Sequence, residues 1–242
     1  MKIDYVIVSS NSNPMYFDFW PIVRDLWIQV VKIKPIFVYI CDEDSIIDNG
    51  DHIIHKLKAI PNVDSGLQSQ IARMYVTKFY SESVCLTSDI DMLPLNRTYF
   101  TDMIESYSND DLVIFSADAY PNIKRYPICY NAAKGKVFND ILDLNCNFET
   151  YCKRLIEYNW GWDTDELYFG KMVAEYTNQR NVVKLNRGWE NRMALYRIDR
   201  DFWNYTAIKL KNNEYIDSHS IRPYSKYKQE IDKLVNTLFS KQ

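Results

Sequence analysis

The stretch VCLTSDIDMLPL, residues 84–95, joins a short apolar run to two aspartates, Asp89 and Asp91, before Pro94 interrupts the pattern. Its first five residues are apolar or small, as in a buried strand. Buried carboxylates are costly unless they are paired or bind a metal ion. Either the strand reaches solvent at Asp89, or a positive group meets the two carboxylates there.

The chain before this stretch alternates apolar runs with helical patterns. Residues 14–32 and 66–80 carry apolar side chains at helical spacing, and Pro21 indicates a helix start or a kink within the first of them. Buried strands are expected at residues 4–10, 35–41, 52–60 and 84–88. Continuous apolar runs that alternate with helices are typical of a parallel sheet covered by helices on both faces. The fold class is therefore α/β, with a mostly parallel central sheet.

The second half of the chain is more mixed. Strands are expected at residues 112–120 and 125–131, with a short strand and a loop within 214–224. Helices are expected at residues 134–144, 148–158, 161–176 and 225–240. Residues 184–210 are irregular and contain several arginines. Because no linker rich in Gly or Ser divides the chain, a single domain is expected over residues 1–242.

The composition is that of a soluble globular protein. The 242 residues carry a net charge of -3, with 47 % hydrophobic and 25 % charged residues. Since there is no basic excess, a nucleic-acid partner is disfavoured. No apolar segment approaches the ~20 residues that a membrane span requires. The aromatic share of 15 % suits stacking on sugars or bases, but aromatic side chains also fill cores.

The cysteines indicate a reducing compartment. The five cysteines form no C-x-x-C pair, and several lie in apolar runs, where Cys behaves as a small hydrophobe. The amino-terminal apolar run is too short for a signal peptide and contains Asp4. A cytoplasmic location is therefore expected, and the Asn-x-Thr sequons at Asn96 and Asn204 are expected to be accidental.

Polar side chains follow three of the expected strands. Ligands bind outside the carboxyl ends of the strands in parallel sheets, so these side chains are expected to converge on one crevice. Two carboxylates one residue apart favour a hard divalent cation such as Mg²⁺ or Mn²⁺, whose remaining ligands are water and substrate phosphates. The alternative is a turn with solvated aspartates. The side chains concerned are Ser9, Ser10, Asn11, Asp42, Asp89 and Asp91.

The segment SDIDML resembles the Asp-x-Asp motif of GT-A glycosyltransferases, in which the aspartates hold a divalent metal that bridges the diphosphate of a nucleotide sugar. DYVIVSSN and ICDED resemble the first two strands of that family, and SQIARMY resembles the helix before the motif. The resemblance covers most of the chain and is nearest to small viral and bacterial nucleotide-diphospho-sugar transferases, including those of large DNA viruses of algae.

The resemblance implies a nucleotide-binding half at residues 1–95 and a donor-sugar and acceptor half at residues 96–242. It implies a UDP-sugar, ahead of a GDP-sugar, as donor, a glycan or glycoprotein as acceptor, and Mn²⁺ or Mg²⁺ as cofactor. Gln70 and Arg73 match the helix that contacts the nucleotide. A viral member would act in the host cytoplasm.

The late segment YIDSHSIRPY contains His219, which matches in chain order the histidine that GT-A enzymes often supply as a further metal ligand. A neutral imidazole suits Mn²⁺ better than Mg²⁺. Arg222 and Lys226 could neutralise the diphosphate. The alternative for His219 is a solvated loop position. His52 and His55 are expected to be structural, because strand alternation places them on opposite faces.

The segment NWGWDTDELYFG, residues 159–170, gathers acids behind two tryptophans. Indole faces stack on pyranose rings and carboxylates accept hydroxyl hydrogen bonds, so a sugar site is predicted, although Asp163 and Glu166 also match a helix capping box. "WGW" followed by acids resembles an acceptor-side motif of some GT-A galactosyltransferases, with a different spacing. The residues concerned are Trp160, Trp162, Asp163, Asp165 and Glu166, of which Asp165 first and Glu166 second are predicted to be catalytic.

Two further predictions concern the donor sugar, one from the resemblance and one from the irregular pattern of residues 185–192. Tyr130 and Asn131 lie where the family contacts the donor sugar and the acceptor, and residues 185–192 form a candidate lid over the donor. In an inverting enzyme Asp165 would be a general base, whereas a retaining enzyme would place a carboxylate behind the anomeric carbon. The alternatives are a nucleotidyltransferase, an aspartyl phosphatase, whose motif belongs after the first strand, and a non-catalytic nucleotide-sugar-binding module.

Overall fold

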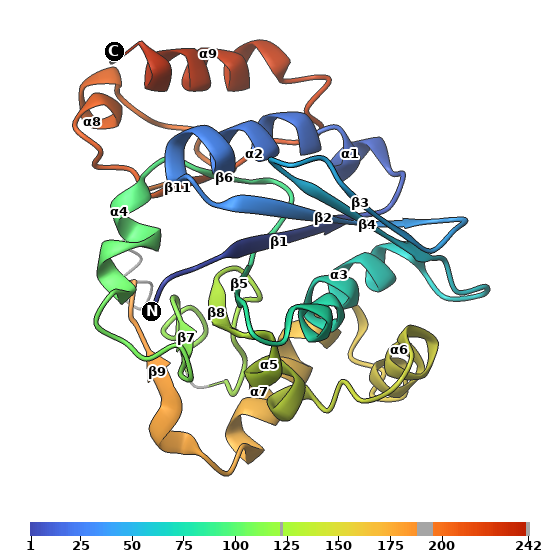
Figure 1. Ribbon diagram of the computed structural model, residues 1–242. Helices are drawn as coiled ribbons and strands as arrows, with labels where there is room; N and C mark the ends of the chain where they lie inside the picture. The colour runs from blue at the N-terminus through green and yellow to red at the C-terminus, as the bar shows by residue number, and fades with distance from the viewer. Residues whose placement is uncertain (122, 188–195, 241–242) are drawn as a thin grey trace.

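The computed structural model describes residues 1–121, 123–187 and 196–240 (Figure 1). Its centre is an eight-stranded sheet with the strand order β3-β4-β2-β1-β5-β8-β7-β9. Strands β4, β2, β1 and β5 are parallel to one another, as the sequence predicts. The strands are β1 (Tyr5–Ser10), β2 (Lys34–Cys41), β3 (Ser45–Asp48), β4 (Ile53–Lys58), β5 (Val84–Thr87), β7 (Leu112–Ile114), β8 (Asn131–Lys134) and β9 (Val182–Lys184).

Helices cover both faces of this sheet (Figure 1). Successive side chains of a strand point to opposite faces, so Val6 and Val8 of β1 pack in one core and Ile7 packs in the other. The first core contains α2 (Trp20–Leu26) and α9 (Lys228–Phe239). The second contains α3 (Ser65–Tyr75), α5 (Gly135–Leu142), α6 (Phe148–Ile156) and α7 (Thr164–Glu175). The central strands are apolar throughout because each is buried on both sides.

Three short strands form a second sheet in the order β10-β11-β6. The sequence predicts that Pro94 interrupts the strand pattern, but Pro94 is the last residue of a strand, β6 (Met92–Pro94). This strand pairs antiparallel with β11 (Asp217–His219). β10 (Arg197–Ile198) pairs parallel with β11. This small sheet brings the carboxyl-terminal His219 opposite Met92, next to the Asp-x-Asp segment.

The helical stretch predicted at residues 14–32 is interrupted. It consists of α1 (Pro14–Phe17), α2 and a π-helical turn (Trp27–Val31). Pro21 lies in the first turn of α2, where its missing N–H costs nothing, so the predicted helix start near this residue is confirmed. Short helices α4 (Arg97–Phe100) and α8 (Ala207–Lys211) lie in segments for which the sequence predicts no element.

Two strand predictions are wrong in position. The strand expected at residues 125–131 is a loop that leads into β8, and the strand expected at 112–120 ends at Ile114. Asn131–Lys134 lacks the β-branched and aromatic residues that favour strands, and it pairs only because β5 and β7 lie on either side of it. Strand β3 was also not expected, because it is an exposed edge strand paired only with β4.

In the part of the chain that the structure describes, no helix combines the length and the apolar character that a membrane crossing demands.

His55 on β4 gives the fold a pH dependence. The ring is buried against Phe79, at 5.1 Å between ring centroids, and its Nδ1 atom has no hydrogen-bond partner. Burial, opposed only by Asp44, lowers the pKa of His55 to about 4. Since an unfolded histidine titrates near ~6.5, the unfolded chain takes up this proton first as the pH falls. The free energy of unfolding is therefore expected to be unaffected by His55 above pH ~6.5 and to drop by on the order of 3 kcal/mol between pH ~6.5 and ~4.

Urea unfolding at pH 7.5 and pH 4.5 checks this expectation by comparing the wild-type protein with His55→Phe, which keeps an aromatic ring and loses the titrating group. The variant should lose much of the destabilisation that the wild-type protein shows at pH 4.5. An unchanged pH dependence in His55→Phe would show that other groups cause it.

Candidate active site

A cavity of about 850 Å³ opens at the carboxyl ends of β1 and β5. Thirteen of the eighteen residues singled out in the sequence line it, although they come from five separate segments of the chain. Sheet topology explains why Ser9, Ser10, Asn11, Asp89 and Asp91 converge, because parallel strands deliver the residues at and after their carboxyl ends to one edge. The thirteen are Ser9, Ser10, Asn11, Gln70, Arg73, Asp89, Asp91, Trp162, Asp163, Asp165, Glu166, His219 and Arg222.

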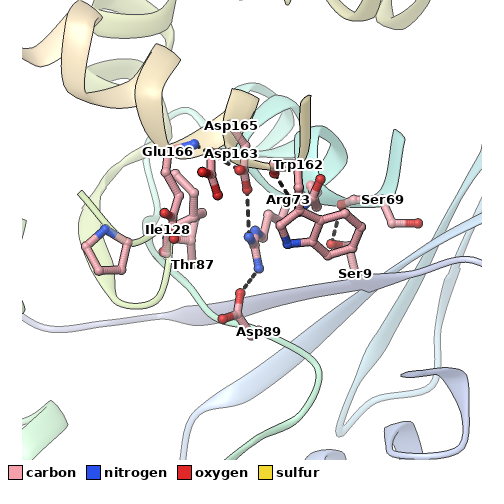
Figure 2. A network of polar contacts seen from close by, with 12 residues as sticks. Ser9, Ser69, Arg73, Thr87, Asp89, Ile128, Trp162, Asp163, Asp165 and Glu166 are labelled. Carbon is pink, nitrogen blue, oxygen red and sulfur yellow. Dashed lines mark hydrogen bonds and ion pairs between the residues drawn. The ribbon is translucent and has the colours of Figure 1, made fainter. Parts of the chain in front are cut away.

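Arg73 joins the two sides of the cavity (Figure 2). Helix α3 supplies it. The helix is capped by Asp64, whose side chain accepts a hydrogen bond from the Leu67 N–H at 2.8 Å. The buried guanidinium pairs with Asp89, which follows β5, and its Nη2 atom lies 2.9 Å from Asp165 Oδ2 in the first turn of α7. Asp89 thus meets a positive group, which is one of the two explanations that its position after a buried strand allows.

Asp91 is the more buried of the two aspartates, with 5 % of its side chain exposed. Its Oδ2 atom accepts no hydrogen bond and is surrounded by positive or imidazole groups. Arg200 Nη2 lies 3.2 Å away, Arg222 Nε 3.5 Å and His219 Nε2 3.9 Å. The pairing of β6 with β11 creates this cluster, and the backbone N–H of Ser220 donates to the Asp91 carbonyl at 2.9 Å.

A second polar network lies on the α7 side of the cavity. Arg125 donates from Nε to Glu166 at 2.6 Å and from Nη2 to Asp163 at 2.9 Å, and its guanidinium lies 4.1 Å from the centre of the Tyr120 ring. Burial and the neighbouring Asp165 carboxylate raise the pKa of Glu166, although Arg125 opposes them. The side chain of Asp163 makes no capping hydrogen bond to α7, so the capping box does not form.

Trp162 stands at the rim of the cavity with 61 % of its surface exposed. Its backbone carbonyl accepts a hydrogen bond from Gln70 Nε2 at 3.3 Å, which ties the rim to α3. Gly66 at the start of α3 lies beside the indole, since a Cβ atom there would be in van der Waals contact with the Trp162 ring at 3.9 Å. An indole this exposed beside two carboxylates can stack on a sugar ring.

Five of the residues predicted for the site do not line the cavity. Tyr130 is fully buried against Trp27 and Phe100. Asn131 is also buried, and its amide donates to the carbonyls of residues 127 and 128. Trp160 stacks on Tyr158, at 4.3 Å between ring centroids. The other two, Asp42 and Lys226, are exposed elsewhere on the surface.

The candidate lid at residues 185–192 falls partly on residues 188–192, which lie outside the described part of the chain.

Sequence reasoning missed four cavity residues that the networks depend on, namely Tyr16, Tyr120, Arg125 and Arg200. The local sequence pattern around each of them gives no indication of a binding site. Tyr16 is in a short helix, Arg125 in a stretch expected to be a strand, and Arg200 among several arginines of an irregular region. The arginine count of residues 184–210 was the available signal, but it does not indicate which arginine faces the cavity.

The residues around Asp91 can be tested as a divalent-cation site. Among the described residues, no three or more His, Cys, Asp or Glu side chains are grouped to hold a metal ion. Asp91 Oδ2 and His219 Nε2 nevertheless face each other at 3.9 Å, just under twice the Mg²⁺–oxygen distance of about 2.0–2.1 Å. A buried carboxylate oxygen without a hydrogen bond calls for a partner. Two protein ligands fit a hard cation that takes its others from water and phosphate.

The net charge of the residues that line the cavity also favours binding of a divalent cation. The described residues that line the cavity include six carboxylates and four arginines, so the cavity has a net charge of -2 when all are ionised and His219 is neutral. A diphosphate would be repelled by this lining as a whole, and one divalent cation would balance it.

Searches against protein-family models and against curated protein sequences give no match. Among solved structures, the glycosyltransferase GlyE of Streptococcus pneumoniae TIGR4 aligns with all of this chain at a TM-score of 0.51 and 11 % identity, and this chain covers 64 % of that one, less than two thirds of its length. The galactosyltransferase LgtC in complex with donor and acceptor sugar analogs aligns with 98 % of this chain and 95 % of its own, at a TM-score of 0.52 and 10 % identity. An active-site mutant of LgtC gives a TM-score of 0.53 at 10 % identity, with 95 % of each chain covered. The chain therefore has a GT-A glycosyltransferase fold, as the sequence predicts.

Proposed function

We propose that this GT-A-fold protein is a glycosyltransferase that moves a sugar from a nucleotide-diphosphate sugar, a UDP-sugar or a GDP-sugar, to a hydroxyl of a glycan or glycoprotein. One observation carries the proposal. A single cavity at the carboxyl edge of the sheet combines a cluster suited to a cation and a diphosphate, around Asp91, with an exposed indole and carboxylates suited to sugars, around Trp162.

The diphosphate end of the cavity is built from Asp91, His219 and Arg222. Asp91 and His219 would hold Mn²⁺ or Mg²⁺, with Asp89 close by. A bound divalent cation offsets the negative charge that develops on a departing diphosphate. Arg222 would contribute to the same end, because its guanidinium donates to the Tyr16 hydroxyl at 2.6 Å and lies 4.9 Å from the Tyr16 ring centre, so it is held in place before any ligand arrives.

At the sugar end, the surroundings of the two predicted catalytic carboxylates favour Glu166 over Asp165. Each carboxylate pairs with an arginine, Asp165 with Arg73 and Glu166 with Arg125, but Asp165 is only 2 % exposed and so is hardly accessible to a ligand. Glu166 is more exposed, and its raised pKa brings it closer to the range in which a carboxylate accepts a proton efficiently at neutral pH. We therefore place Asp165 as the group that orients Arg73 and Glu166 as the candidate proton acceptor.

Hydrolysis of nucleotide sugars tests the proposal. Incubating the protein with UDP- and GDP-sugars and Mn²⁺ is expected to release nucleoside diphosphate slowly from at least one donor, because water replaces the missing acceptor. Chelation of the metal should stop the release. A non-catalytic binding module would bind a nucleotide sugar without hydrolysing it, and failure to bind any of these donors would contradict the proposed function altogether.

A further inference from the structure

Arg200 occupies the position at which a cation would serve the Asp91–His219 pair. Its Nη2 atom lies 3.2 Å from Asp91 Oδ2, and its Nε atom donates to His219 Nδ1 at 3.3 Å. One guanidinium thus contacts both of the groups proposed to hold the metal. A divalent cation bound between them would lie against this positive charge, and the repulsion would weaken its binding.

Arg200 is itself incompletely satisfied. Its Nη1 atom is buried and has no hydrogen-bond partner, which is costly for a charged donor. Arg222, by contrast, is held by the hydroxyl and the ring of Tyr16. Of the two arginines beside Asp91, Arg200 is therefore the one whose movement loses fewer favourable contacts. Its Nη1 group can also donate a hydrogen bond to an anion.

The hydrogen bond from Arg200 also determines which nitrogen of His219 carries hydrogen. When Nδ1 accepts from Arg200, the neutral ring carries its hydrogen on Nε2, and Nε2 then has no lone pair for a metal. Metal binding through Nε2 requires the hydrogen on Nδ1, donated to an acceptor. Asp199 Oδ2 lies 3.8 Å from Nδ1 and can accept this hydrogen once Arg200 has left and the two side chains move closer together.

We propose, on the basis of the function proposed above, that Arg200 is a displaceable resident cation. It pairs with Asp91 and His219 in the absence of ligands, gives this position up to the divalent metal, and pairs instead with the diphosphate. Asp199 is the positioning residue that then orients His219. Metal and nucleotide must consequently bind with positive coupling, because Arg200 gains a new anionic partner only when the diphosphate is present.

Titration of the full chain with Mn²⁺, followed by electron paramagnetic resonance with and without UDP, tests this inference without relying on activity. In the wild-type protein UDP should tighten Mn²⁺ binding by about 5–150-fold. Arg200→Gln should bind Mn²⁺ alone about 10-fold more tightly than the wild-type protein, because the competing charge is gone, and should lose most of the coupling. Arg180→Gln, an exposed arginine outside the cavity, is the matched control and should behave as wild type.

Two further variants distinguish a specific role of Arg200 from a general folding defect in Arg200→Gln. Arg200→Lys keeps the charge but cannot bridge both partners, so its affinity for Mn²⁺ alone should lie between those of the wild-type protein and Arg200→Gln. Asp199→Asn should weaken Mn²⁺ binding in the presence of UDP by about 10–100-fold. Mn²⁺ affinity that is unchanged or weaker in a folded Arg200→Gln, with UDP still bound, would overturn the role of Arg200 alone. If the wild-type protein took up neither Mn²⁺ nor UDP, the proposed function would fail as well.

Discussion

Replacing Asp91 by Asn is expected to lower donor hydrolysis and sugar transfer by on the order of 10³-fold, because it removes the charge on which the diphosphate end of the cavity depends. The Asp91 carboxylate is the proposed metal ligand, and it is the shared counterion of Arg200 and Arg222. An amide of the same shape keeps the volume of the side chain but leaves these two arginines facing a neutral group. Mn²⁺ binding should be lost together with activity.

Release of nucleoside diphosphate in the presence of Mn²⁺ measures this effect. Asp140→Asn is the matched control, since Asp140 is exposed on α5 and does not line the cavity. Circular dichroism should show that both variants are folded. Donor hydrolysis that persists at the wild-type rate in Asp91→Asn would exclude the metal assignment.

Replacing Asp217 by Asn is expected to lower the free energy of unfolding by about 3–5 kcal/mol, the range found when one partner of a buried ion pair is removed. Asp217 is fully buried in β11 between two arginines. Arg187 Nη2 lies 2.8 Å from Oδ1, and Arg197 Nη2 lies 2.8 Å from Oδ2. Burial alone would raise the pKa of Asp217, but the two guanidinium groups outweigh it and hold the pKa well below its ordinary value.

Urea unfolding near pH 7 measures this loss, with Asp140→Asn expected to stay within about 0.5 kcal/mol of the wild-type protein. The contribution of Asp217 is fully present above the unfolded-state pKa of about 3.9 and disappears only as the pH falls towards the depressed pKa of the folded state. Asp217→Asn should therefore differ from wild type at pH 7 and less so in strong acid. Equal stability at pH 7 would show that the remaining interactions of the two arginines are sufficient.

This ion-pair cluster also matters for the site. Asp217 lies two residues before His219 on β11, and Arg197 lies on the neighbouring β10. The cluster thus holds the strand that presents His219 to Asp91. Asp217→Asn is expected to affect Mn²⁺ binding through position, whereas Asp91→Asn affects it through charge.

The amino-terminal half of the fold could be predicted because its signals are local. A strand buried on both faces must be apolar along its whole length, and an amphipathic helix must repeat its apolar residues at helical spacing. Residues 4–10, 35–41 and 84–88 satisfy the first condition, and 66–80 satisfy the second. Once these elements alternate, the position of Asp89 and Asp91 at the carboxyl edge of the sheet follows from topology.

Local sequence patterns did not predict the strands whose formation depends on pairing with strands distant in the chain. Asn131–Lys134 is a strand because β5 and β7 flank it, and Pro94 belongs to a strand because β11 returns to it from the far end of the chain. The position of Tyr130 also depends on residues distant in the chain. Its place in the chain order suggested a contact with the sugar, but its ring packs against Trp27 and Phe100 in the core.

By itself, the sequence determined the class of fold and the edge of the sheet that carries the cavity, since both depend on periodicity within single segments. Residue types and the resemblance to GT-A glycosyltransferases indicated thirteen of the side chains that line the cavity. Only the tertiary structure decided which charges meet there. It pairs Asp89 with Arg73 and surrounds Asp91 with Arg200, Arg222 and His219. Electrostatic interactions depend on distance in space, and residues more than a hundred positions apart in the chain carry no local pattern that records how close they lie.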